Sequence, residues 1–220
     1  MEESKFDEKL KNSSLIISAG MPRSGSTLLF NILREILSSK WPGQVSAGWI
    51  SDLLELPERN IYLVKVHNFS PYFRTRANHA FYTYRDVRVA QVSRSKKFNH
   101  TPSIKSIRSD LNQYLVAKKF CDQVIKYEDL ISNPKHFVQT IARLIGITVD
   151  PKDIVNKAFY LQPPETQETK GGYSRQTLLH KNHFTYTKNH EWRSFFTKRL
   201  QRDINNEFSW WFKECGYPLD

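Results

Sequence analysis

A short glycine-containing turn between a strand and a helix constrains this chain more than any other feature. Residues 14–19 form a brief apolar run, SLIISA, that ends at Gly20. The turn reads Gly20-Met-Pro-Arg-Ser-Gly25-Ser-Thr, and an apolar stripe at helical spacing follows over residues 28–37. In turns of this kind, backbone N–H groups of the loop and of the helix N-terminus surround a phosphate. The sequence therefore predicts a phosphate-binding loop at residues 20–27.

The turn lacks the lysine that nucleoside-triphosphate chemistry needs. In loops that bind a triphosphate, a lysine next to the last glycine reaches the β- and γ-phosphates, but Ser26 holds that position here. The basic residue of the turn is Arg23, whose guanidinium can bind two oxygens of a phosphate or sulfonate at once. We expect a loop that holds a nucleotide phosphate without transferring a γ-phosphoryl group. The alternative is an ordinary turn in which Ser24 or Ser26 caps the helix.

Strands and helices alternate along the rest of the chain. Short β-rich runs are predicted at residues 61–66, 80–84 and 123–126. Helical patterns cover residues 87–96, 103–120, 133–146 and 191–213, and residues 162–174 read as a long loop. This alternation favours a parallel sheet covered on both faces. We predict a single three-layer α/β/α domain with a central parallel sheet over residues 1–220. Its first 13 residues are expected to be a polar leader.

Charge and composition limit the class of partner. Lysine and arginine total 33 against 22 aspartate and glutamate residues, a formal net charge of +11 that suits a nucleic acid, an acidic membrane surface or a phosphorylated nucleotide. No apolar run approaches the roughly 18 residues of a membrane span. The start lacks a signal-peptide pattern, so we expect a cytoplasmic protein. With only 2 cysteines, neither a disulfide framework nor a cysteine-based zinc site is expected.

Two segments together point to a known enzyme family. Pro22–Leu29, PRSGSTLL, resembles the 5′-phosphosulfate loop of sulfotransferases that use 3′-phosphoadenosine-5′-phosphosulfate (PAPS). Lys65-Val-His67, at the end of a predicted strand, is similar to the family's K-x-H segment, in which the histidine is the catalytic base. A side chain just beyond the carboxyl end of a parallel strand lies where ligand crevices open, and an imidazole titrates near neutrality. A structural or surface histidine is the alternative.

Three later segments match the same family in order. Arg85 and Ser93 resemble the pair that binds the 3′-phosphate. Tyr127 begins a YEDL segment in which the family's tyrosine lies near the adenine. Lys170-Gly171 is similar to the late Lys-Gly pair that closes over a phosphate, but Thr169 stands where the family has arginine. The segments that shape the acceptor pocket in animal cytosolic members are shorter here, so the acceptor cannot be read from the resemblance.

The resemblance implies a compact, bacterial-type PAPS-dependent sulfotransferase with the P-loop-like sulfotransferase fold. It would move a sulfuryl group to a hydroxyl or amine and release adenosine 3′,5′-bisphosphate (PAP), with no metal ion. His67 would be the general base, while Arg23 and Lys65 would neutralise charge on the leaving 5′-phosphate oxygen. The residues expected to bind the nucleotide are Arg23, Ser24, Gly25, Ser26, Thr27, Arg85, Ser93, Tyr127, Lys170 and Gly171.

Two other functions stay open at this point. A P-loop nucleotide or small-molecule kinase is the first, although Ser26 argues against it. A nucleic-acid-binding module is the second, because aromatic residues between Trp192 and Phe212 could stack bases, although their helical spacing favours packing on a sheet. We expect no nucleic-acid partner. The acceptor could be a small molecule, a glycan or a peptide, and basic clusters near Arg74, Arg94 and Lys105 suit an acidic one. The oligomeric state is open.

Overall fold

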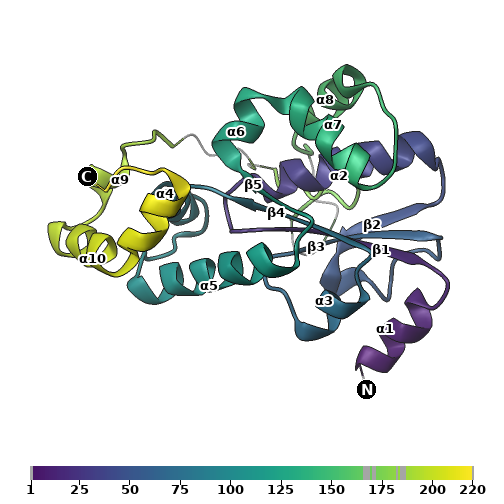
Figure 1. Ribbon diagram of the computed structural model, residues 1–220, viewed down its shortest axis with the longest axis horizontal. Helices are drawn as coiled ribbons and strands as arrows, with labels where there is room; N and C mark the ends of the chain where they lie inside the picture. The colour runs from purple at the N-terminus through teal and green to yellow at the C-terminus, as the bar shows by residue number, and fades with distance from the viewer. Residues whose placement is uncertain (1, 166–168, 170–171, 182, 184–186, 220) are drawn as a thin grey trace.

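A parallel β-sheet between two layers of helices forms the centre of the protein (Figure 1). The computed structural model describes residues 2–165, 169, 172–181, 183 and 187–219. Within them the sheet has five strands in the order β2-β3-β1-β4-β5, all parallel. The strands are β1 (Ser14–Gly20), β2 (Val45–Trp49), β3 (Ile61–Val66), β4 (His79–Tyr84) and β5 (Gln123–Lys126). The predicted three-layer α/β/α fold is confirmed.

Alternate residues of each strand enter two separate apolar cores. On β1, Leu15 and Ile17 point into one core, whereas Ile16 points into the other. On β3, Leu63 belongs to the same core as Ile16. Because side chains alternate along a strand, Lys65 lies on the same face as Leu63, although it is charged. The face of the sheet that carries Lys65 is therefore the face of the phosphate loop's helix.

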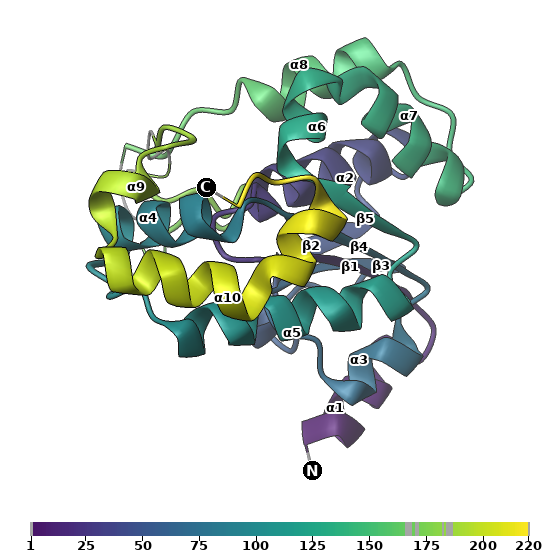
Figure 2. The same ribbon diagram turned by 60° about the vertical axis from the view of Figure 1, so that its left-hand side comes forward.

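Helices cover both faces of the sheet. The core that contains Leu63 is closed by α2 (Ser26–Lys40), α6 (Tyr127–Ser132), α7 (Pro134–Leu144) and α8 (Pro151–Phe159). The other core is closed by α1 (Glu2–Leu10), α3 (Pro71–Arg76), α4 (Val87–Phe98), α5 (Ile104–Phe120), α9 (Trp192–Phe195) and α10 (Lys198–Cys215). Figure 2 shows α10 lying beside α5. A short 3₁₀ turn, η1 (Ile50–Asp52), follows β2. No helix in the described part of the chain is both long and apolar enough to cross a membrane.

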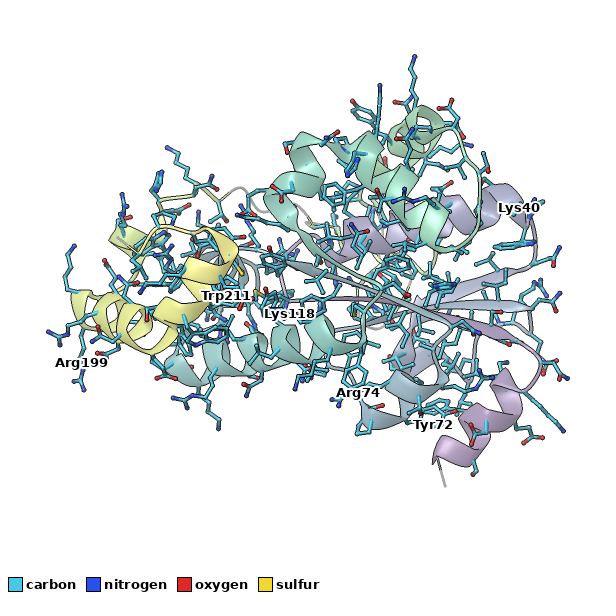
Figure 3. The ribbon with its side chains drawn as sticks, viewed as in Figure 1. Lys40, Tyr72, Arg74, Lys118, Arg199 and Trp211 are labelled. Carbon is cyan, nitrogen blue, oxygen red and sulfur yellow. The ribbon has the colours of Figure 1, made fainter. Side chains whose placement is uncertain are left out.

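The segment predicted as a polar leader contains helix α1. Its last residue, Leu10, is fully buried, and the Phe6 ring packs against Tyr72 and Phe73 of α3, with centroid distances of 6.1 and 5.6 Å. Figure 3 labels Tyr72 on the side of α3 that faces α1. Tyr72 Oη also donates a hydrogen bond to Asp7 Oδ1 at 2.8 Å. The helix has few apolar positions, and it is held by this contact with α3.

A buried arginine joins the start of α4 to the C-terminal segment. Arg88 is fully buried, and its guanidinium donates to both oxygens of Asp86, at 3.0 and 2.7 Å. It also donates to the carbonyl oxygen of Pro218 at 2.7 Å and lies between the rings of Trp192 and Phe212. Most of the C-terminal aromatic residues are therefore packed in the core, whereas Phe195 and Trp210 are exposed. The loop after β4 is fixed by the same contacts.

Candidate active site

Side chains on, or shortly after, each of the five strands line one cavity of about 460 Å³ at the carboxyl edge of the sheet. The sheet order changes direction at β1, with β3 and β2 on one side and β4 and β5 on the other. Ligand crevices open at such points in α/β sheets. The contributing side chains, in the order of their strands, are Arg23, Trp49, Lys65 and His67, Arg85, and Tyr127.

The loop after β1 has the backbone of a phosphate cradle. Arg23 and Gly25 both have positive φ angles, 68° and 83°, and the helix α2 begins directly after Gly25. Ser24 is fully buried, and its hydroxyl lies 2.7 Å from the carbonyl oxygen of Met21 and 2.9 Å from that of Thr83. The Ser24 side chain therefore ties the loop to β4 and does not line the cavity, whereas Gly25, Ser26 and Thr27 line it.

Arg23 connects three segments that are far apart in the sequence. Its Nε donates to Ser93 Oγ at 3.0 Å, and its Nη2 donates to the carbonyl oxygen of His183 at 3.1 Å. Burial and the nearby charge of Arg85 lower the pKa of the Arg23 guanidinium. Arg23, Arg85 and Ser93 all line the cavity, so the structure brings the predicted 3′-phosphate pair next to the arginine of the loop.

Lys65 is buried against the first turn of α2. Its Nζ donates to Thr27 Oγ1 and lies 4.4 Å from the centre of the Trp49 ring. Burial, with a smaller contribution from Arg23, lowers the pKa of Lys65 to about 7. The amine can therefore exchange its proton near neutral pH, and it lies where an anionic ligand on the loop would restore its charge.

His67 is held in the tautomer that a general base needs. Its Nδ1–H donates to the carbonyl oxygen of Gly20 at 2.8 Å, because a carbonyl can only accept. Nε2 then carries the lone pair. Burial and, next, the charge of Lys65 lower the pKa of His67 to about 4. At neutral pH the imidazole is uncharged, with its basic nitrogen available for a proton.

Arg85 and Tyr127 also line the cavity and contact each other. The Arg85 guanidinium carbon lies 4.6 Å from the centre of the Tyr127 ring, and Arg85 Nε lies 3.9 Å from Glu128 Oε1. Among the described residues, the buried Nε of Arg85 has no hydrogen-bond partner. The Tyr127 ring also packs on Gly25, where a Cβ would come within 2.6 Å of the ring. A buried, unsatisfied guanidinium N–H fits an anionic ligand.

Sequence reasoning missed several residues of the cavity. Beside Tyr127, an apolar end of the cavity is lined by Leu28, Ile131, Ala158, Phe159 and Leu161. The other missed lining residues are Pro22, Asn31, Trp49, Phe98, Leu179, His180 and His183. Asn31 lies four positions after Thr27 on α2, a spacing that could have identified it. The predicted Lys170 and Gly171 lie outside the described residues. In the described part, no group of three or more His, Cys, Asp or Glu side chains is placed to hold a metal ion.

Comparison with known structures identifies the fold. No protein-family model and no curated protein matches the chain in sequence. A mouse sulfotransferase complexed with PAP superposes with a TM-score of 0.64 at 13% identity, over 94% of this chain and 88% of the other. The chain has the sulfotransferase fold. Two crystal structures of retinol dehydratase, one with androsterone and PAP and one with retinol and PAP, agree.

The two retinol dehydratase comparisons give TM-scores of 0.56 and 0.57, each at 12% identity and over 96% of this chain, and they cover 84% and 85% of those chains. All three solved proteins contain PAP. At such low identity the likeness establishes the sulfotransferase fold, which is the fold that the PRSGSTLL and K-x-H resemblance implied. The chemistry has to be argued from the residues of the cavity.

Proposed function

We propose that this protein is a PAPS-dependent sulfotransferase that moves a sulfuryl group to a hydroxyl of its acceptor. The observation that carries the proposal is a neutral, correctly oriented imidazole together with one buried amine and one partly buried guanidinium at a single phosphate loop. His67 supplies the base, and Lys65 and Arg23 supply the charge. All three line the same cavity. The sulfotransferase fold supports this assignment.

The cavity offers two subsites that can bind an anion and one apolar subsite, as the two phosphate-bearing ends and the adenine of PAPS require. The turn of Gly25, with the N-terminus of α2, suits the 5′-phosphosulfate. Arg85 and Ser93 suit the 3′-phosphate, and the unsatisfied Nε of Arg85 is consistent with an anion at that position. The apolar end beside Tyr127 suits the adenine. The residues present therefore fit PAPS, and Lys170 and Gly171 remain proposed contributors to its binding.

The transfer exchanges one sulfur–oxygen bond for another. The acceptor hydroxyl gives its proton to His67 Nε2 while its oxygen bonds to sulfur. The bond between sulfur and the 5′-phosphate oxygen breaks, and that oxygen leaves with its electron pair as part of PAP. Lys65 and Arg23 stabilise the negative charge that grows on the leaving oxygen. In-line transfer of this kind resembles phosphoryl transfer, but the transferred group carries less charge.

The kinase alternative has less support from the cavity. Ser26 occupies the position of the essential lysine of a triphosphate loop. Kinases also hold Mg²⁺ with a carboxylate at the site. Among the described residues that line the cavity, none is an aspartate or a glutamate.

Three of the basic side chains expected to attract an acidic acceptor are paired with carboxylates, and two others contact a ring or a backbone carbonyl. The pairs are Arg74 with the ring of Phe120, Arg76 with the carbonyl of Leu10, Arg94 with Asp110, Lys96 with Glu191 and Arg108 with Glu207. These contacts leave less reason to expect a strongly acidic acceptor.

Ligand binding and two substitutions test the proposal. PAP should raise the melting temperature of the protein, whereas ATP with Mg²⁺ should leave it nearly unchanged. His67→Ala should abolish transfer of labelled sulfate from PAPS to a panel of acceptors and keep PAP affinity within a few-fold. Arg85→Ala should weaken PAP far more than 5′-AMP, which lacks the 3′-phosphate. Stabilisation by ATP alone, or transfer by the His67 variant, would contradict the proposal.

A further inference from the structure

A second cavity, of about 680 Å³, lies at the amino edge of the sheet, where the parallel strands begin. We name it the amino-edge cavity. Its volume is within the range of small-ligand pockets, roughly 300–1,000 Å³. The six residues of β3 separate it from the edge that carries His67, a length of about 20 Å. A ligand in the amino-edge cavity would therefore not compete with a nucleotide at the phosphate loop.

An amide side chain precedes each of four adjacent strands at this edge. Gln44, Asn60 and Asn78 come directly before β2, β3 and β4, and Asn12 comes two positions before β1. All four line the amino-edge cavity, and all four are exposed to solvent. Because these strands are neighbours in the order β2-β3-β1-β4, the amides follow one another along the edge of the sheet.

The fold uses only part of the hydrogen-bonding capacity of these amides. Asn78 Oδ1 accepts from the backbone N–H of Leu15 at 2.8 Å, and Asn60 Nδ2 donates to Gln44 Oε1 at 3.2 Å. Among the described residues, Asn60 Oδ1 then has no donor, while Asn78 Nδ2 and Gln44 Nε2 have no acceptor. The amino-edge cavity thus offers donors and acceptors together. A hydroxyl group matches both, whereas a phosphate or carboxylate can only accept.

The charged side chains of the amino-edge cavity are basic. Lys11 is exposed, and the half-buried guanidinium of Arg76 donates to the carbonyl oxygen of Leu10. No aspartate or glutamate occurs among the described residues of the lining. His79 also lines the cavity, and its Nδ1 lies 3.5 Å from Oδ2 of Asp122, which is outside the lining. Lys11 and Arg76 therefore favour an anionic group on the ligand.

An aromatic ring and three isoleucines give the amino-edge cavity an apolar surface as well. Trp41 and Ile145 are half-buried, and Ile16 and Ile61 are buried at the starts of their strands. A tryptophan ring offers a broad flat apolar face. The faces of a sugar ring carry C–H groups that pack on such a ring, while its hydroxyls point outward from the rim. A small inorganic anion has no such faces.

We propose that the amino-edge cavity binds a saccharide that carries an anionic group. The hydroxyls of the sugar would pair with the amides before the four strands, and its anionic group would pair with Lys11 and Arg76. The ring would pack against Trp41. The amino-edge cavity would be a second binding site, separate from the proposed nucleotide site.

Four probes separate the features of this ligand, with binding measured by ligand-observed NMR in the presence and absence of saturating PAP. Glucuronate has the sugar hydroxyls and a carboxylate. Glucose lacks the charge, cyclohexanecarboxylate lacks the hydroxyls, and triglutamate has charge and N–H donors but no sugar ring. We expect glucuronate to bind on the order of tenfold more tightly than each of the other three, and PAP should leave its affinity unchanged.

Two pairs of variants assign the binding to the amino-edge cavity. Lys11→Gln should weaken glucuronate at least about threefold and leave glucose unchanged. Lys40→Gln is its control, since Lys40 at the end of α2 (Figure 3) is equally exposed but does not line the cavity. Asn60→Ala should weaken both sugars about fivefold. Asn156→Ala, which removes an exposed amide of α8 outside the cavity, should weaken neither.

Several results would overturn the proposal. Loss of glucuronate binding when PAP is added would place the sugar beside His67 instead. Equal binding of cyclohexanecarboxylate or triglutamate would indicate a general anion site or a site for acidic peptides. Undetectable binding of glucuronate, or full binding in both Lys11→Gln and Asn60→Ala, would also contradict it. The proposed function is tested separately, by PAP binding and sulfuryl transfer.

Discussion

Raising the pH from 7 to 9 should weaken PAP binding about 50-fold, because binding must restore a proton to Lys65. In the free protein, burial and the charge of Arg23 lower the pKa of Lys65 to about 7. Half of the molecules then carry the charge at pH 7, and about 1% do at pH 9. A phosphate beside the amine returns its pKa toward the ordinary value of 10.5. The loss of affinity corresponds to roughly 2.3 kcal/mol.

Calorimetry in two buffers of different ionisation enthalpy measures both the affinity and the protons taken up. Binding should take up about half a proton per PAP at pH 7 and nearly one at pH 9. Lys65→Arg is the matched control, since its guanidinium stays charged throughout this range, and its affinity should be flat with pH. A change of less than about threefold in the wild type, or the same slope in Lys65→Met, would refute the reasoning.

Three substitutions test other parts of the structure. Arg88→Met strands a buried carboxylate and should lower the free energy of unfolding in urea by roughly 3–5 kcal/mol; a loss below about 1 kcal/mol would contradict the pairing with Asp86. Gly25→Ala should weaken PAP binding at least tenfold, because a Cβ there would meet Tyr127 2.6 Å away. Gly43→Ala is the control, because Gly43 has a similar positive φ but no atom near an added Cβ; this variant should lose stability and keep its PAP affinity. Equal PAP affinities in the two variants would contradict a clash with Tyr127. Burial raises the pKa of Asp110 from 3.8 to about 6. Between pH 3.8 and about 6 the folded state therefore binds more protons than the unfolded state, and the free energy of unfolding falls as the pH rises through this range. The advantage of Asp110→Asn in unfolding free energy should therefore grow by roughly 2–3 kcal/mol from pH 4 to pH 7, and a constant difference would contradict it.

Strands buried on both faces were predictable, and the edge strand β2 was not. Residues 61–66 form an unbroken apolar-rich run that is wholly buried, so the pattern identifies it directly. In β2 the buried positions are Ser46 and Gly48, while Val45, Ala47 and Trp49 are only half-buried. The hydrophobic pattern is therefore the reverse of what a half-buried strand should show. Helix α1 was missed for a related reason, since its stability comes from α3 rather than from an apolar stripe of its own.

The position of a residue in the chain predicted its presence in the site better than it predicted its contacts. The carboxyl ends of parallel strands meet at one edge, which is why Arg23, Lys65, His67 and Arg85 line the same cavity. Ser24 belongs to the same motif, but its hydroxyl faces the backbone of β4, which a linear pattern cannot show. The contact of Trp49 with Tyr173 could not be predicted at all, because it joins β2 to a segment more than 120 residues further along the chain, which is held there by the hydrogen bond from Tyr173 to Asp52.

The contacts of Arg23 also bear on the order in which the molecule can be completed during synthesis. Within the described residues, the strand that ends at Lys126 is the last of the sheet, so all five strands leave the ribosome before the late segments of the site. Arg23, however, takes partners 70 and 160 residues further along. Helices α9 and α10, which close one of the two cores on the sheet, also follow residue 183. Both the site and the covering of that face of the sheet are therefore completed by the last part of the chain.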